Sequence, residues 1–109
     1  MAYRQEKIIE QIHHLSADFL ERESNRGSLI TVTSVILSDD AKEATIYVTV
    51  LPDSKEKAAL DFLKRRRSDF KEYFKKHSAI GRIPFFDFQI DLGQKNAIRI
   101  DELSKESDQ

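Results

Sequence analysis

The basic side chains of this sequence are concentrated between Lys64 and Arg82. This stretch holds eight Lys and Arg residues against two acidic residues, a net charge of +6. The remaining ten basic and seventeen acidic residues give the rest of the chain a net charge of −7. A local basic surface on an otherwise acidic protein attracts polyanions, whatever the overall net charge. The chemistry that this stretch offers is therefore the binding of a polyanion, although a charge run is also typical of a solvated helix face.

The same stretch carries regularly spaced aromatic rings. Four of them follow the spacing i, i+3, i+4, i+7 of one helix face: Phe70, Tyr73, Phe74 and His77. We expect this face to pack in the core rather than to stack on bases, whereas three lysines lie off it: Lys71, Lys75 and Lys76. Ser68 is the predicted N-cap of this helix, and Asp69 falls in the first turn, where the helix dipole favours an acidic residue.

If this stretch binds nucleic acid, a defined set of residues would contact the phosphates. The main set comprises the basic side chains and one residue at a helix start: Lys64, Arg65, Arg66, Arg67, Ser68, Lys71, Lys75, Lys76 and Arg82. A weaker set lies at the ends of the first predicted helix: Arg4, Lys7, Arg22 and Arg26. The backbone amides of Ser68 and Asp69 would face one phosphate at a helix N-terminus. The basic side chains would hold further phosphates, which fixes position without reading sequence.

Other residue types give no sign of covalent or metal chemistry. The sequence has no cysteine, which excludes thiol nucleophiles, thiolate metal sites and disulfides. Its three glycines are not clustered, so it has no phosphate-cradling glycine loop. His13 and His14 are adjacent and point in different directions on a helix, and Asp39 and Asp40 fall in a predicted turn. We expect no enzyme activity, no metal and no cofactor.

Length and hydropathy predict one cytoplasmic domain. A chain of 109 residues is long enough for one modest hydrophobic core. No apolar run approaches the roughly 18 residues that a membrane span needs, and the lack of cysteine suits a reducing compartment. We therefore expect a protein that makes no membrane contact.

Hydrophobic periodicity predicts an alternation of helices and strands. The sequence predicts a helix over 3–23, followed by strands over 29–37 and 43–50. A second helix is capped by Asp53 or Ser54, and after a break near Ser68 a third helix continues until Gly81 and Pro84 end it. A strand over 85–91 comes next, and after Gly93 a short helix contains Ile100 and Leu103. The order α-β-β-α-α-β-α predicts an α+β fold like KH type II, with a three-stranded sheet backed by helices. We expect this single domain over residues 1–103 and a short flexible C-terminal tail over 104–109.

The predicted hairpin also resembles a known family. Two runs are similar to the hairpin pattern of the ribosome-binding factor A family, bacterial assembly factors of the small ribosomal subunit: Ile30-Thr31-Val32-Thr33-Ser34-Val35-Ile36-Leu37-Ser38-Asp39-Asp40 and Ala44-Thr45-Ile46-Tyr47-Val48-Thr49-Val50-Leu51. Arg82-Ile83-Pro84, before a strand with Phe86 and Phe88, resembles the family's entry to its last strand. The resemblance extends from the first helix to about Leu103.

Three features depart from the family pattern. The family's Ala-x-Gly between the two later helices is replaced by about Arg66-Arg67-Ser68, and its Asp-Pro after the first helix is replaced by Ser24-Asn25-Arg26-Gly27. The usual long C-terminal tail is short in this sequence. These departures concern the geometry of the kink more than the fold.

The resemblance implies a function in ribosome assembly. It implies a protein that binds free small (30S) ribosomal subunits and assists late assembly and maturation of the 5′ end of 16S rRNA, without covalent chemistry. We expect this protein to act as a monomer. Two alternatives stay open from the residues alone. One is a generic KH-like RNA-binding protein with a different RNA target, and the other is a protein-interaction domain whose basic helix docks an acidic partner.

Overall fold

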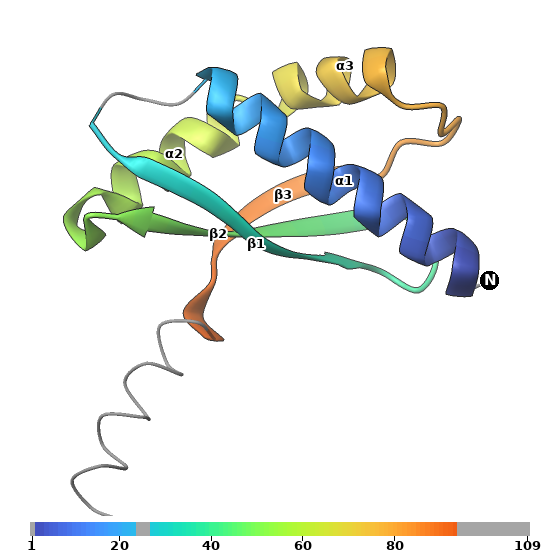
Figure 1. Cartoon of the computed structure of the whole chain (residues 1–109), viewed down its shortest axis with the longest axis horizontal. Coiled ribbons are helices and arrows are strands. Elements are labelled where there is room, and N and C mark those ends of the chain that lie inside the picture. The colour runs from blue at the N-terminus through green and yellow to red at the C-terminus, as the bar shows by residue number, and fades with distance from the viewer. Residues whose placement is uncertain (1, 24–26, 94–109) are drawn as a thin grey trace, which may run out of the picture.

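The fold consists of three α-helices, one short 3-10 helix and a three-stranded sheet within the described residues (Figure 1). A computed structural model describes residues 2–23 and 27–93, apart from the side chains of residues 2–4 and 23. The elements follow in the order α1 (Ala2–Glu23), β1 (Leu29–Leu37), β2 (Glu43–Leu51), η1 (Asp53–Lys55), α2 (Glu56–Arg65), α3 (Arg67–His77) and β3 (Phe85–Ile90).

The sheet has the strand order β1-β2-β3, with all three α-helices on one of its faces (Figure 1). β1 and β2 form an antiparallel hairpin, whereas β3 lies parallel to β2 with Phe86 opposite Ala44 and Ile90 opposite Val48. A parallel neighbour needs a crossover connection, and α2 and α3 supply it. The predicted α+β fold with a three-stranded sheet backed by helices is confirmed.

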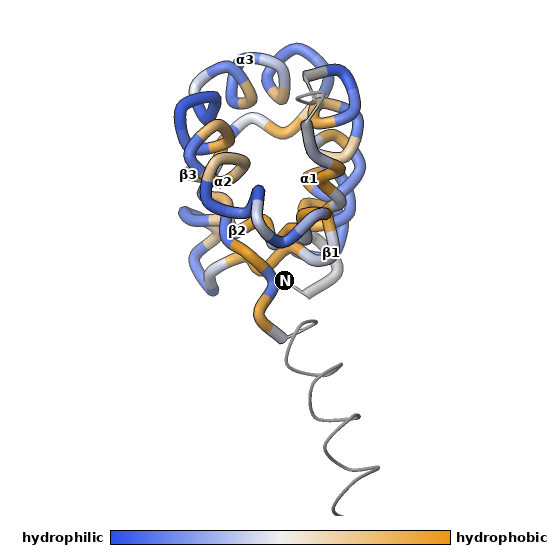
Figure 2. Tube along the Cα trace, turned by 90° about the vertical axis from the view of Figure 1, so that its left-hand side faces the viewer, coloured by the Kyte–Doolittle hydropathy of each residue, from blue (hydrophilic) through white to orange (hydrophobic). Residues whose placement is uncertain are grey.

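The hydrophobic core lies between the helices and the covered face of the sheet. Four β2 residues alternate into it and are buried: Ala44, Ile46, Val48 and Val50. Phe70 and Phe74 of α3 are fully buried, and the Phe70 ring lies 4.7 Å from the Phe86 ring and 5.4 Å from the Phe19 ring, between centroids. The hydropathy colouring shows the same inward arrangement of apolar residues (Figure 2). The aromatic face of α3 is therefore core at Phe70 and Phe74, as the sequence predicted, whereas Tyr73 is half-buried and His77, in the last turn of the helix, is exposed.

The predicted ends of the two later helices need correction. α3 begins at Arg67, so Ser68 is not its N-cap; Arg66 holds that position and makes no side-chain cap bond. Arg66 alone leaves helical geometry, while its N–H still donates to the carbonyls of Phe62 and Leu63. Its own carbonyl accepts from Phe70, so the chain turns with little loss of hydrogen bonding.

The other boundary corrections have similarly local causes. A 3-10 turn over Asp53–Lys55 precedes α2, which begins at Glu56, so neither Asp53 nor Ser54 is the N-cap of α2. α3 ends at His77 because Ser78 is already extended, and Gly81 and Pro84 lie in the loop beyond. The predicted helix with Ile100 and Leu103 and the tail over 104–109 lie outside the described residues.

We expect Phe70 to be the most sensitive position of the core. Phe70→Ala should lower the free energy of unfolding by about 3–5 kcal/mol, because it removes a fully buried ring that packs against both α1 and β3. Urea unfolding followed by circular dichroism measures this change. Lys71→Ala on the same helix is the matched control, because Lys71 is exposed and surface substitutions change stability by about 0.5 kcal/mol or less. Equal effects of the two substitutions would contradict the core assignment.

Candidate nucleic-acid interface

A basic groove lies where the junction of α2 and α3 meets the start of β3. It has a volume of about 540 Å³ and nine lining residues: Lys42, Lys64, Arg67, Ser68, Lys71, Ile83, Pro84, Phe85 and Phe86. Four of the nine carry a positive charge and none is acidic. Four cations around one concave surface give a positive potential that suits a polyanion better than a neutral ligand.

The helical side of the groove is formed by residues on both sides of the turn at Arg66. Lys64 lies in the last turn of α2, and Arg67 and Ser68 lie in the first turn of α3. Lys71 follows Arg67 by four residues, and this spacing puts their side chains on the same face of α3. The structure therefore brings together four of the predicted binding residues: Lys64, Arg67, Ser68 and Lys71.

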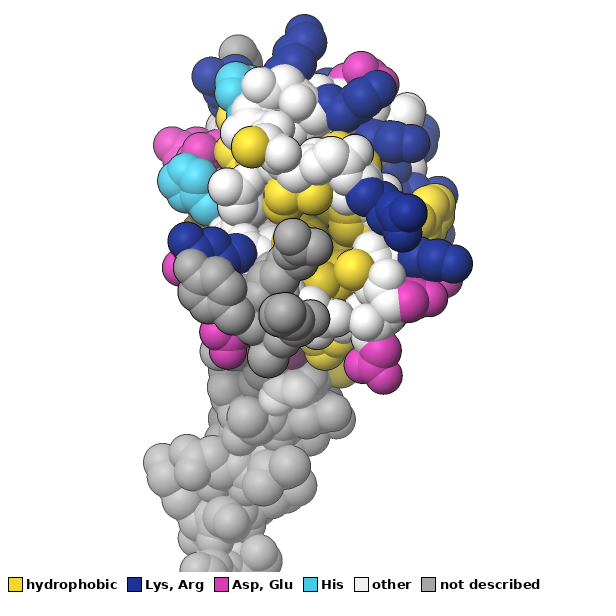
Figure 3. All heavy atoms as spheres, turned by 90° about the vertical axis from the view of Figure 1, so that its right-hand side faces the viewer, with side chains coloured by type: hydrophobic (Ala, Val, Ile, Leu, Met, Phe, Trp, Pro, Cys, Tyr) yellow, Lys and Arg dark blue, Asp and Glu magenta, His cyan; other side chains and the backbone are white. Residues whose placement is uncertain are grey.

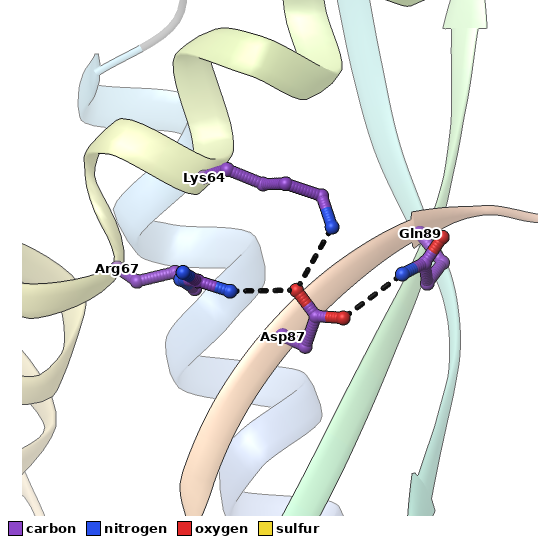
Figure 4. Close-up of polar contacts among 4 residues, drawn as sticks. All are labelled: Lys64, Arg67, Asp87 and Gln89. Carbon is purple, nitrogen blue, oxygen red and sulfur yellow. Dashed lines mark hydrogen bonds and ion pairs between the residues drawn. The ribbon is translucent and has the colours of Figure 1, made fainter.

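Asp87 of β3 holds two of these cations in place (Figure 4). The same carboxylate oxygen of Asp87 lies 3.2 Å from the Lys64 Nζ and 3.0 Å from an Arg67 guanidinium nitrogen. The other oxygen accepts a 2.9 Å hydrogen bond from the Gln89 side chain. The Arg67 guanidinium also lies 5.2 Å from the centre of the Phe85 ring, within the range of a cation–π contact.

The charge of Asp87 is favoured by these contacts. Burial by itself raises the pKa of the Asp87 carboxyl, but hydrogen bonds from Gln89 and Lys64 and the positive charge of Lys64 outweigh burial and hold the pKa below its usual value. Asp87 is therefore ionised near neutral pH. One carboxylate offsets part of the charge of two cations, so the groove keeps a net positive charge.

Lys42 is a member of the groove that the sequence did not indicate. It belongs to the hairpin loop, where its N–H donates to the Ser38 hydroxyl and the Asp40 carboxylate. Its carbonyl accepts a 2.8 Å hydrogen bond from the N–H of Phe85. Hydrogen bonds from Ser38 and Lys42 lower the pKa of Asp40. The N–H of Ala41 donates to the carbonyl of Ser38 at 2.8 Å, so this loop is a turn, as predicted. No local sequence signal reveals Lys42, because its place depends on the pairing of β2 with β3.

The three consecutive arginines point to different surroundings. Arg67 enters the groove, whereas Arg65 is exposed and does not line it. Arg66 instead lies against the aromatic core, with its guanidinium 5.6 Å from the Phe62 ring centre and its Nε 2.7 Å from an Asp69 carboxylate oxygen. The structure therefore gives Arg66 a packing role at the helix junction.

The remaining predicted residues lie away from the groove lining. Lys75, Lys76 and Arg82 are exposed. In Figure 3, Lys and Arg side chains lie along the upper and right-hand edges of the molecule. Arg22 of α1 has its guanidinium 5.5 Å from the centre of the ring of Tyr73 in α3. The side chain of Arg4 and the whole of Arg26 lie outside the described residues.

The described residues contain neither a cluster of metal ligands nor a helix that could cross a membrane. Over residues 2–23 and 27–93, no three His, Cys, Asp or Glu side chains are grouped as metal ligands. Within the same part of the chain, no helix has the length and apolarity of a membrane span.

The α-β-β-α-α-β order and the basic groove at the helix junction define a KH-like domain, a class of module that binds RNA. The sequence model of one family, described as ribosome-binding factor A, matches residues 4–104. The chain therefore belongs to the ribosome-binding factor A family.

Named relatives and solved structures agree with this assignment. Ribosome-binding factor A of Geobacter metallireducens is 32% identical over 109 residues, which cover 97% of this chain and 92% of that protein. The crystal structure of ribosome-binding factor A from Thermus thermophilus superimposes with a TM-score of 0.68 at 22% identity, covering 77% of this chain and 92% of that one. A Thermus thermophilus homology model fitted into a cryo-EM map of a complex with the 30S subunit gives the same TM-score at 23% identity, with 76% and 90% coverage.

The Asp87 contacts predict a pH-dependent contribution to stability. Because the pKa of Asp87 is lower in the folded chain than the ordinary 3.8, its carboxylate stabilises the fold at higher pH, and this stabilisation is lost as the pH falls through the lowered pKa. Asp87→Asn should therefore lower the free energy of unfolding near neutral pH by about 1 kcal/mol. The difference from the unsubstituted protein should shrink as the medium becomes acidic.

Urea unfolding at a series of pH values measures this effect. Asp39→Asn is the control for the loss of one acidic charge, because Asp39 is exposed in the hairpin loop. A stability difference for Asp87→Asn that stays constant over the acidic range would contradict the role of the ionised carboxylate.

Proposed function

We propose that this protein binds the small (30S) ribosomal subunit and assists its late assembly, including maturation of the 5′ end of 16S rRNA. The observation that carries the proposal is the groove, which has four basic lining residues and no acidic one. Family membership supports it, and so does the Thermus thermophilus relative that was fitted into a 30S complex.

The groove would act by binding the phosphates of folded rRNA. Lys42, Lys64, Arg67 and Lys71 come from three different elements, so together they fit a backbone that is already bent or folded. Contacts of this kind position the protein, and the shape of the rRNA would supply specificity. The net negative charge of the rest of the chain would weaken binding to RNA that does not fit the groove.

The proposed action is binding without covalent chemistry. The groove offers cations, one hydroxyl and apolar surface, and these groups neutralise charge without activating a nucleophile. We propose that the protein works as a monomer in the cytoplasm, where ribosomal subunits are assembled. Lys75, Lys76 and Arg82 would extend the phosphate contacts beyond the groove, as would the exposed Arg65. We propose weaker phosphate contacts for four other arginines: Arg66, Arg4, Arg22 and Arg26.

Cosedimentation with separated small subunits, large subunits and joined ribosomes tests this function. We expect selective binding to free small subunits that weakens as salt is raised, because each phosphate contact releases counterions. Lys42→Gln/Lys71→Gln should bind at least tenfold more weakly, and the slope of log affinity against log salt should become shallower by about 1.4 to 1.8 for the two lost contacts.

One control variant and two alternative outcomes make the experiment decisive. Lys55→Gln/Lys57→Gln also removes two exposed positive charges but lies at the other end of α2, so it should bind like the unsubstituted protein. Equal binding to all particles would instead indicate a general RNA-binding protein. Binding to small subunits that survives nuclease treatment of exposed rRNA would indicate docking to an acidic protein surface.

A further inference from the structure

Phe85 is an exposed aromatic residue within the basic groove. Its exposed fraction is 59%, although Phe86 and Phe88 of the same strand are buried. Among the described residues, the other large hydrophobic residues with similar exposure are aliphatic: Leu29, Ile36, Leu51 and Leu92. Single exposed apolar residues are common on protein surfaces. The position of Phe85 is what sets it apart, because it lines the groove with four basic residues.

The backbone of Phe85 is fixed at the start of β3, and its ring has one charged neighbour. Its backbone N–H donates to the carbonyl of Lys42 at 2.8 Å, and Phe85 pairs with Glu43 at the start of the parallel ladder. The guanidinium of Arg67 lies 5.2 Å from the ring centre and is itself bonded to Asp87. The fixed backbone and the contact with Arg67 restrict the ring, so less conformational freedom is lost when a flat ligand packs on it than for a side chain without these contacts.

The surrounding charges define what this ligand can be. Cations on several sides of an exposed ring suit a molecule with a flat apolar surface and negative charges on both flanks. An unpaired nucleotide within an RNA strand has this chemistry, because its base is free to stack and a phosphate precedes and follows it. A base inside a duplex is already stacked on its neighbours, so a duplex offers phosphates and 2′-hydroxyls but no free base face.

We propose that Phe85 is a stacking platform for one unpaired base of RNA, with Lys42, Arg67 and Lys71 binding the flanking phosphates. This inference rests on the proposed function and narrows it, because the groove would then select unpaired rather than double-helical RNA. The Arg67 guanidinium already makes a cation–π contact with the Phe85 ring, and this contact would orient the ring on which the base stacks.

Phe85→Trp gives a direct optical test. The sequence has no tryptophan, so the substitution introduces the sole indole of the chain. A single-stranded oligouridylate of about ten nucleotides should quench its fluorescence on binding, whereas the duplex of that strand with oligoadenylate should not. Leu51→Trp, at a position of 60% exposure outside the groove, is the control and should not be quenched by either RNA. Equal quenching of Phe85→Trp by both RNAs, or quenching by neither, would overturn the proposal.

Affinity measurements separate stacking from charge. Phe85→Leu keeps an apolar side chain and should bind the oligouridylate about 5- to 150-fold more weakly, from the range for stacking on aromatic side chains. Its salt dependence should be unchanged, and Phe85→Tyr should bind like the unsubstituted protein. Urea unfolding of Phe85→Leu checks that the exposed substitution leaves the fold intact.

The two proposals fail in different ways. If Phe85→Leu binds single strands like the unsubstituted protein while Lys42→Gln/Lys71→Gln loses small-subunit binding, stacking is wrong and the proposed function stands. If the lysine variant also keeps full subunit binding, the groove itself is not the interface. Binding of the duplex as tightly as the single strand by the unsubstituted protein would also contradict the proposal.

Discussion

The parallel pairing of β3 with β2 is the constraint on which the groove depends. It places Phe85 opposite Glu43, so that the N–H of Phe85 bonds to the carbonyl of Lys42 and the hairpin loop meets the start of β3. The same pairing forces the connection through α2 and α3 to cross over the sheet. Asp87 then lies within bonding distance of Lys64 and Arg67. Three segments that are distant in sequence are thereby fixed around one surface.

The groove combines charges that repel one another with contacts that hold them together. Lys42, Lys64, Arg67 and Lys71 would favour separation if each were free to move. The backbone bonds of Lys42 and the ion pairs of Asp87 prevent this, and the buried aromatic face of α3 anchors the helix that carries Arg67 and Lys71. Because a single carboxylate leaves a positive excess, the site is organised before binding yet still attracts an anion.

The sequence predicted the parts that depend on local pattern. Alternation along β2 and β3 and the helical spacing of Phe70 and Phe74 gave the strands, the sheet face and the core, because burial follows these periods directly. The local pattern could not give the directions of the three arginines, which depend on a turn confined to Arg66. It also missed Lys42, whose position follows from long-range pairing. The alternation along β3 places Phe85 and Asp87 on the side of the strand that faces away from the core. This pattern does not show that they belong to a binding site, because that depends on their position beside α2.

Short-range crosslinking in the complex with small subunits would locate the RNA-binding surface of the protein. The chain has no cysteine, so single thiols can carry a photoactivatable crosslinker at chosen places. Ser68→Cys lies in the groove without removing a charge, and Thr31→Cys is exposed on β1, outside the groove. We expect crosslinks to 16S rRNA from position 68 and few from position 31. Equal crosslinking from both, or stronger crosslinking from position 31, would contradict the assignment of the groove as the RNA-binding surface.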